Sequence, residues 1–193
     1  MKNLKPLLAV PLFCIAPMLA AAGEPAAEDF VSRRSEFVTL VPGKTVELPA
    51  LRGDDRSASR LAAMTTQIYH FGNWTGVPTY SIGAISGSTV YHPLPNPLNF
   101  SEPDVFWGSA QAFVDVPALT PWTQVFAYTT NPSDPYGQAK TCSWQVDVSV
   151  VNGACTANVT TSAYGQQGAT CLIGDGAWVD PASCKLYVAV SIE

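Results

Sequence analysis

Three observations in the amino-acid sequence predict an all-β fold. From Thr65 onward the chain is a series of short extended runs separated by Gly, Pro and Asn, without a long helical pattern between them. Residues 142–155 contain a cleanly alternating strand followed by a turn dipeptide, and four cysteines lie in the same half of the chain. These features favour an antiparallel β-sandwich, immunoglobulin-like or jelly-roll-like, with two disulfides and a short N-terminal helix or arm.

The strongest single element is residues 142–155, CSWQVDVSVVNGAC. Its odd-even pattern places cysteine, tryptophan and three valines on one side of an extended chain and polar residues on the other. Asn152-Gly153 tolerates the two positive φ angles of a type I′ turn, so the chain is expected to return antiparallel. A two-residue turn at this point places Val150 opposite Cys155 and Cys142 opposite Ala163.

Residues 1–22 read as a secretory signal peptide. Two lysines precede an apolar run, and Ala20 to Ala22 are small residues suited to cleavage before Gly23. A retained anchor is the alternative, but Cys14 follows the bulky Phe13, where a lipoprotein signal has a small residue. No later segment has the ~18 uninterrupted apolar residues of a membrane-spanning helix. We therefore expect a protein without a membrane span that is secreted or periplasmic, and the short signal favours a bacterial source.

The remaining chain divides into residues 23–64, an N-terminal arm or first strands, and residues 65–193, the β-sandwich domain. In the first part, strands are expected near 36–41 and 45–49 around a Pro42-Gly43-Lys44 turn, and a short helix near 57–63 with Ser57 as N-cap. In the second part the final strand alternates clearly, with Leu186, Val188, Val190 and Ile192 on one face. The predicted strands of the second part are 66–71, 88–92, 105–107, 112–116, 122–130, 143–151, 154–161 and 185–192.

Four cysteines remain after signal removal, Cys142, Cys155, Cys171 and Cys184, and they predict two disulfides in an oxidising compartment. Zinc is disfavoured because no C-x-x-C pair is present. In the predicted hairpin, Cys142 and Cys155 lie about 26 Å apart at ~3.3 Å per residue, too far for a bond. If the last strand ran antiparallel to residues 154–161, Cys142 would pair with Cys184 and Cys155 with Cys171, the connectivity that we favour over the third.

Charge argues against some partners. After Arg60 the chain contains two lysines and eight acidic residues, a net charge of −6. Nucleic acids and anionic lipid surfaces are bound by clustered Lys and Arg, so neither is expected as a partner.

Catalytic candidates are few. His70 and His92 are the available histidines, and no G-x-S-x-G elbow is present. Glu102 and Asp104, beside Phe106 and Trp107, have the spacing of paired glycosidase carboxylates, although Pro103 between them favours solvated acids in a turn. No metal or cofactor is predicted.

Binding candidates come from the aromatic residues. Trp74, Trp107 and Trp122 adjoin turn residues, where exposed rings can stack on sugars, or else plug the end of the sandwich. Trp144 belongs to the predicted core.

These features predict an exported, non-catalytic protein that binds carbohydrate or a protein partner at or outside the cell envelope. One alternative is a secreted hydrolase that uses Glu102, Asp104 or a histidine. Another is a surface-fibre subunit in which residues 37–48 complete a neighbour's sheet by strand addition. A histidine beside an acid in a cleft would favour the hydrolase, a coplanar row of tryptophans the sugar-binding protein, and a projecting N-terminal strand the fibre.

Overall fold

The computed structural model describes residues 37–51, 64–83, 85–87, 89–100 and 108–193, which form two β-sheets and no helix. The first sheet, sheet A, contains β1 (Phe37–Thr39), β3 (Met64–Asn73), β5 (Thr89–His92), β6 (Ser109–Pro117), β10 (Cys171–Gly174), β11 (Trp178–Val179) and β12 (Leu186–Ile192). The second, sheet B, contains β2 (Thr45–Glu47), β4 (Tyr80–Gly83), β7 (Trp122–Thr129), β8 (Thr141–Val151) and β9 (Ala154–Tyr164).

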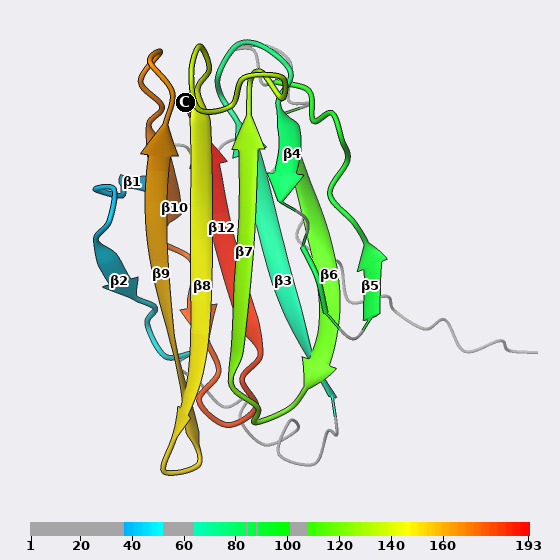
Figure 1. Cartoon of the computed structure of the whole chain (residues 1–193). Helices are drawn as coiled ribbons and strands as arrows, with labels where there is room; N and C mark the ends of the chain where they lie inside the picture. Colours follow the sequence, from blue (N-terminus) through cyan, green and yellow to red (C-terminus); the bar gives the residue numbers. More distant parts are fainter. Residues whose placement is uncertain (1–36, 52–63, 84, 88, 101–107) are drawn as a thin grey trace, which may run out of the picture.

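Strand order is β1-β10-β12-β3-β6-β5 in sheet A, with β11 also on β12, and β2-β9-β8-β7-β4 in sheet B. The named strands pair antiparallel except β12 and β3, which are parallel neighbours in sheet A. The two sheets lie one behind the other in a sandwich-like arrangement (Figure 1). The predicted all-β, mainly antiparallel class is confirmed.

The β8–β9 hairpin has the predicted register. Val150 pairs with Cys155 and Cys142 with Ala163. Asn152 and Gly153 have φ angles of 52° and 75°, the two positive values that a type I′ turn requires. Because a one-residue slip would reverse every side chain, this turn decides which face of both strands is buried.

The core lies between the two sheets and is rich in aromatic side chains. Phe71 of β3 stacks on Tyr128 of β7 with ring centroids 4.0 Å apart, and Trp144 of β8 contacts Phe71 edge to face. Phe126 stacks on Trp144 at 5.6 Å. As predicted, Trp144 is fully buried, and so are the alternate residues Leu186, Val188, Val190 and Ile192 of β12.

Two short N-terminal strands join the two sheets. β1 pairs with β10 in sheet A, and β2 pairs with β9 in sheet B, so the turn between them crosses from one layer to the other. Leu40 and Leu48, which follow these strands, are buried in the core. The segment 37–48 is therefore paired within its own chain.

Three strands were missed by the sequence prediction: β4, β10 and β11. Each has four residues or fewer, too short for alternation to be recognised. The helix expected near 57–63 and the strand expected at 105–107 lie outside the described residues.

The favoured disulfide connectivity was wrong. The bridges join Cys142 to Cys171 and Cys155 to Cys184, with Cα separations of 5.7 and 5.2 Å. The prediction assumed that β12 runs antiparallel beside β9, whereas β12 belongs to the other sheet and begins at the turn end of the hairpin, where Cys155 lies (Figure 1). The exclusion of a Cys142–Cys155 bond is confirmed, and both bridges connect the β8–β9 hairpin to the sheet A side.

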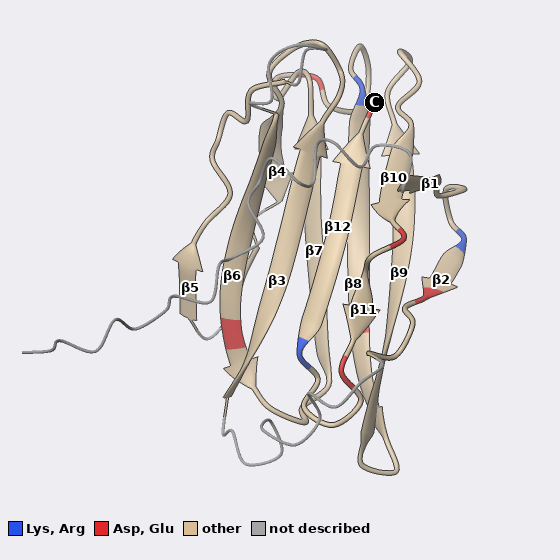
Figure 2. Ribbon diagram, turned by 180° about the vertical axis from the view of Figure 1, so that it is seen from behind, with Lys and Arg blue, Asp and Glu red and all other residues tan. Residues whose placement is uncertain are grey.

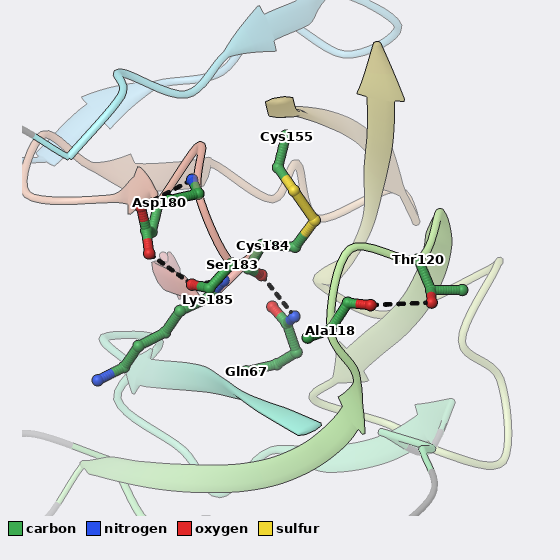
Figure 3. Close-up of a disulfide and its surroundings, with 9 residues drawn as sticks. Gln67, Ala118, Thr120, Cys155, Asp180, Ser183, Cys184 and Lys185 are labelled. Carbon is green, nitrogen blue, oxygen red and sulfur yellow. Dashed lines mark hydrogen bonds between the residues drawn. A yellow bond between two sulfur atoms is a disulfide. The ribbon is translucent and has the colours of Figure 1, made fainter. Parts of the chain in front are cut away.

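Figure 3 shows the second bridge and the turn that presents Cys184. The buried Asp180 carboxylate accepts hydrogen bonds from the Ser183 hydroxyl and from the Ala182 backbone N–H. The side-chain amide of Gln67, in β3, donates to the Cys184 carbonyl at 2.8 Å. The turn, sheet A and the hairpin are thereby held together at one end of the molecule.

The part of the chain that the structure describes contains no helix with the length and hydropathy needed to cross a membrane.

Replacing Cys155 and Cys184 together by alanine should lower the free energy of unfolding by about 3.5 kcal/mol, because each bridge spans a sequence separation of 29 residues and constrains the unfolded chain. Guanidinium unfolding of the oxidised protein and of the double variant measures the difference. Equal midpoints would contradict this role.

Non-reducing peptide mapping should recover Cys142 linked to Cys171 and Cys155 linked to Cys184. A peptide that joins Cys142 to Cys184 would show that the arrangement of β12 described above is incorrect.

Candidate functional site

Three of the five predicted binding residues, Glu102, Asp104 and Trp107, lie outside the described residues. The other two, Trp74 and Trp122, are partly buried and lie apart from each other. Trp74 follows β3, its backbone N–H donates to Ile192, and its side chain packs against Ala189 on the outer face of sheet A. The structure therefore does not bring these two tryptophans into one row.

Trp122, at the start of β7, points between the sheets. Its ring lies 6.1 Å from that of Tyr69 and packs against the core. It also borders a hollow of about 190 Å³ lined by Gly87, Val116, Pro117, Thr120 and Pro121. Trp122 is therefore packed against the core at the start of β7.

His70 faces outward from sheet A but is only 2% exposed. Its Nδ1 atom lies 3.2 Å from the Tyr187 hydroxyl and 3.2 Å from the side-chain nitrogen of Gln111. Since an amide nitrogen only donates, Nδ1 is the acceptor of a neutral imidazole. Burial lowers the pKa of His70 to about 3, so the ring stays neutral at ordinary pH.

A row of apolar and aromatic side chains crosses the outer face of sheet A next to His70. Direct cross-strand pairs connect Trp178 to Tyr187, Tyr187 to Ile68, and Ile68 to Phe113. At the far end, the Tyr91 and His92 rings of β5 lie 5.9 and 5.3 Å from the Phe113 ring. We call these six residues the aromatic row.

Alternation explains why these side chains point outward. In β6, Ala112 and Val114 are fully buried between the sheets, so Phe113 must project to the opposite side. The same reasoning places Tyr187 outward between the buried Leu186 and Val188. Ile68, Phe113, Trp178 and Tyr187 are half-buried, and Tyr91 is 44% exposed, so solvent reaches the row.

Polar groups border the aromatic row on both sides. On one side Asp115 accepts a hydrogen bond from Thr66 at 2.8 Å and a longer one from the Tyr91 hydroxyl at 3.4 Å. On the other side lies the amide of Gln111, which contacts His70. The face thus combines flat apolar surfaces with hydrogen-bonding groups at their edges.

The outer face of sheet B has a different chemistry. Hydroxyl and amide side chains dominate it, with the Thr45 and Thr160 hydroxyls 2.9 Å apart. Asp147 accepts hydrogen bonds from Thr123 at 2.7 Å and Gln145 at 2.8 Å. Many of these polar groups thus bond to one another, and the exposed large apolar side chains of β7 to β9 are Val125 in the middle of the face and Val151 and Tyr164 at strand ends, 48%, 58% and 40% exposed.

Positive charge is scarce over the described residues. The lysines are Lys44, Lys140 and Lys185, against the acidic residues Glu47, Asp115, Asp134, Asp147, Asp175, Asp180 and Glu193. On the side of sheet A, Figure 2 shows blue at the start of β12 and red within β6, below β10 and near β11. Among the described residues, the positive charge beside the aromatic row is thus limited to Lys185.

No protein-family model, curated protein or solved structure matches this chain. Any assignment of function must therefore come from the chemistry of its surfaces.

Sequence reasoning missed the aromatic row because its members come from five strands. Tyr91, Phe113 and Tyr187 each occupy outward positions in strands that were predicted, which was a usable signal. Their alignment depends on strand order, above all on the parallel pairing of β12 with β3, which no local pattern indicates.

The free energy of unfolding should decrease as the pH falls from about 6.5 toward 3, because the unfolded chain protonates His70 in this range and the folded protein does not. This residue alone contributes up to about 1.4 kcal/mol per pH unit. Urea unfolding at several pH values should show a shallower dependence for His70→Gln. The exposed His92→Gln is the matched control and should retain the dependence of the original protein. Parallel curves for His70→Gln and the original protein would contradict the role of burial.

Proposed function

We propose that this chain is an exported, non-catalytic protein that binds carbohydrate through the aromatic row on sheet A. The observation that carries the proposal is the continuous line of cross-strand pairs from Trp178 through Tyr187 and Ile68 to Phe113, extended by the rings of β5.

The chemistry of the row suits a sugar. Sugar rings present flat patches of C–H bonds that pack on aromatic faces, while their hydroxyl groups need hydrogen-bonding partners around the edge. Asp115 and Gln111 supply a carboxylate and an amide at the border of the row. A protein partner is the second possibility, and the polar border of the row favours the sugar.

The hydrolase alternative receives less support. Two of its residues, Glu102 and Asp104, lie outside the described part of the chain. The described contacts of His70 are to a hydroxyl and an amide, and burial keeps it neutral. His92 is exposed beside aromatic rings. The described contacts of the two histidines are therefore to hydroxyl, amide and aromatic groups, whereas a catalytic base is oriented by an acid.

The fibre alternative also receives less support. The segment 37–48, which it would donate to a neighbour, is paired with β10 and β9 of its own chain and contributes Leu40 and Leu48 to the core. Donation would require these contacts to be given up.

Two disulfides fit a protein that folds in an oxidising compartment. With the signal-like residues 1–22, they support the proposal that the protein is secreted or periplasmic in a bacterium. We further propose that the two layers are a true β-sandwich of the immunoglobulin-like or jelly-roll-like kind, supported by the shared aromatic core and by the bridges between the layers.

Phe113→Ala should weaken binding to a recognised glycan about tenfold, since it removes the central ring of the row; tenfold corresponds to about 1.4 kcal/mol. A glycan array identifies the ligand, and calorimetric titration of each variant measures its affinity. Trp178→Ala should act in the same direction.

Val125→Ala is the matched control, because it removes an exposed apolar side chain from the outer face of sheet B. It should leave the affinity unchanged. Thermal unfolding of all variants verifies that they are folded at the temperature of the titration. Equal loss of affinity in Val125→Ala, or none in a folded Phe113→Ala, would refute the assignment of the site.

A further inference from the structure

We propose that the ligand is an uncharged, linear polysaccharide chain that lies across the strands of sheet A and contacts Trp178 at one end of the aromatic row and Tyr91 at the other. This inference rests on the proposed carbohydrate-binding function and specifies the length, direction and charge of the bound chain.

The length follows from the strand order. From β11 through β12, β3 and β6 to β5 there are four steps between neighbouring strands, at about 4.8 Å each. The row is therefore about 19 Å long, more than one sugar ring covers. These strands lie side by side in Figure 2.

The direction follows from what borders the row along the strands. The next outward-facing residues after Tyr187 in β12 and Ile68 in β3 are Ala189 and His70, which are 3% and 2% exposed. On the other side of the row, the neighbouring outward-facing residues of β3 and β6 are Thr66 and Asp115, which are polar and bonded to each other. The apolar surface thus extends over five strands across the sheet, whereas along the strands it continues at β12, where the half-buried Trp74 and Phe37 pack on Ala189. A chain that ran parallel to the strands would contact the row at one strand and miss the rings at its ends.

The charge of the chain follows from the composition of the face. Acidic polysaccharides need cations to offset the cost of removing their carboxylates or sulfates from water. The described strands of sheet A contain no lysine or arginine; Lys185 directly precedes β12, and Asp115 beside the row balances this single positive charge. A neutral chain fits this surface, because its hydroxyl groups can donate to Asp115 and accept from Gln111.

Subsites along the row predict a dependence on chain length. Disaccharides cover part of the row, whereas longer chains add contacts until both ends are reached, and each added ring contributes free energy. Affinity should therefore increase with length and then become constant. Replacement of Trp178 or Tyr91, at the ends of the row, should lower the affinity for long oligosaccharides more than the affinity for short ones.

The test uses oligosaccharides of increasing length prepared from linear neutral glucan, mannan and xylan, with polygalacturonate fragments as the acidic counterpart. Calorimetric titration should show affinity for one neutral series that rises at least tenfold from the disaccharide to the plateau, and weaker binding of the acidic series.

Two end variants sharpen the test. Tyr91→Ala and Trp178→Ala should each reduce affinity for plateau-length chains about fivefold or more and bring the plateau to a shorter length. Val125→Ala, on the outer face of sheet B, is the control and should behave like the original protein at every chain length. Thermal unfolding confirms that each variant is folded.

The possible failures are distinguishable. Affinity that is independent of chain length, yet lost in Phe113→Ala, would overturn the extended chain and leave the proposed function intact. Preference for the acidic series would overturn the inferred charge. Binding to no glycan on the array and in none of the series would overturn the proposed function, and this inference with it.

Discussion

Both ends of the β8–β9 hairpin are attached to the opposite side of the molecule by disulfides, and this constraint determines how the two sheets face each other. Cys142 is linked to Cys171 at the open end and Cys155 to Cys184 near the turn. Two attachment points prevent one layer from rotating over the other. The inward side of sheet A is therefore fixed against Trp144 and its neighbours, and its outward side is fixed as well.

The outward faces of the two sheets differ because their outward-facing positions carry different types of side chain. In sheet B these positions carry Thr, Ser, Gln and Asn, which bond to one another along and between strands. In sheet A they carry rings aligned by direct cross-strand pairing, beside the buried His70. The side chains of the aromatic row are the feature of sheet A on which the proposed binding surface rests.

Local sequence patterns were sufficient to predict most of the strands, but they did not predict which strands pair with one another. The alternation of residues 142–151 and the Asn152-Gly153 turn led to the correct hairpin register. The disulfide connectivity was wrong because it depended on the sheet to which β12 belongs, and period-two alternation does not distinguish one sheet from the other. The aromatic row was missed for the same reason. Tyr187 and Ile68 become neighbours only through a parallel pairing between distant segments.

The parallel contact between β3 and β12 also has a kinetic consequence. Paired residues such as Gln67 and Leu186 are 119 positions apart in the chain, whereas the β8–β9 hairpin closes through two residues. Contacts over such long separations form slowly, because chain entropy is lost before any energy is gained. The hairpin can thus form early, whereas the middle of sheet A forms only when β12 is inserted between β10 and β3. The aromatic row is therefore incomplete until β12 has been inserted.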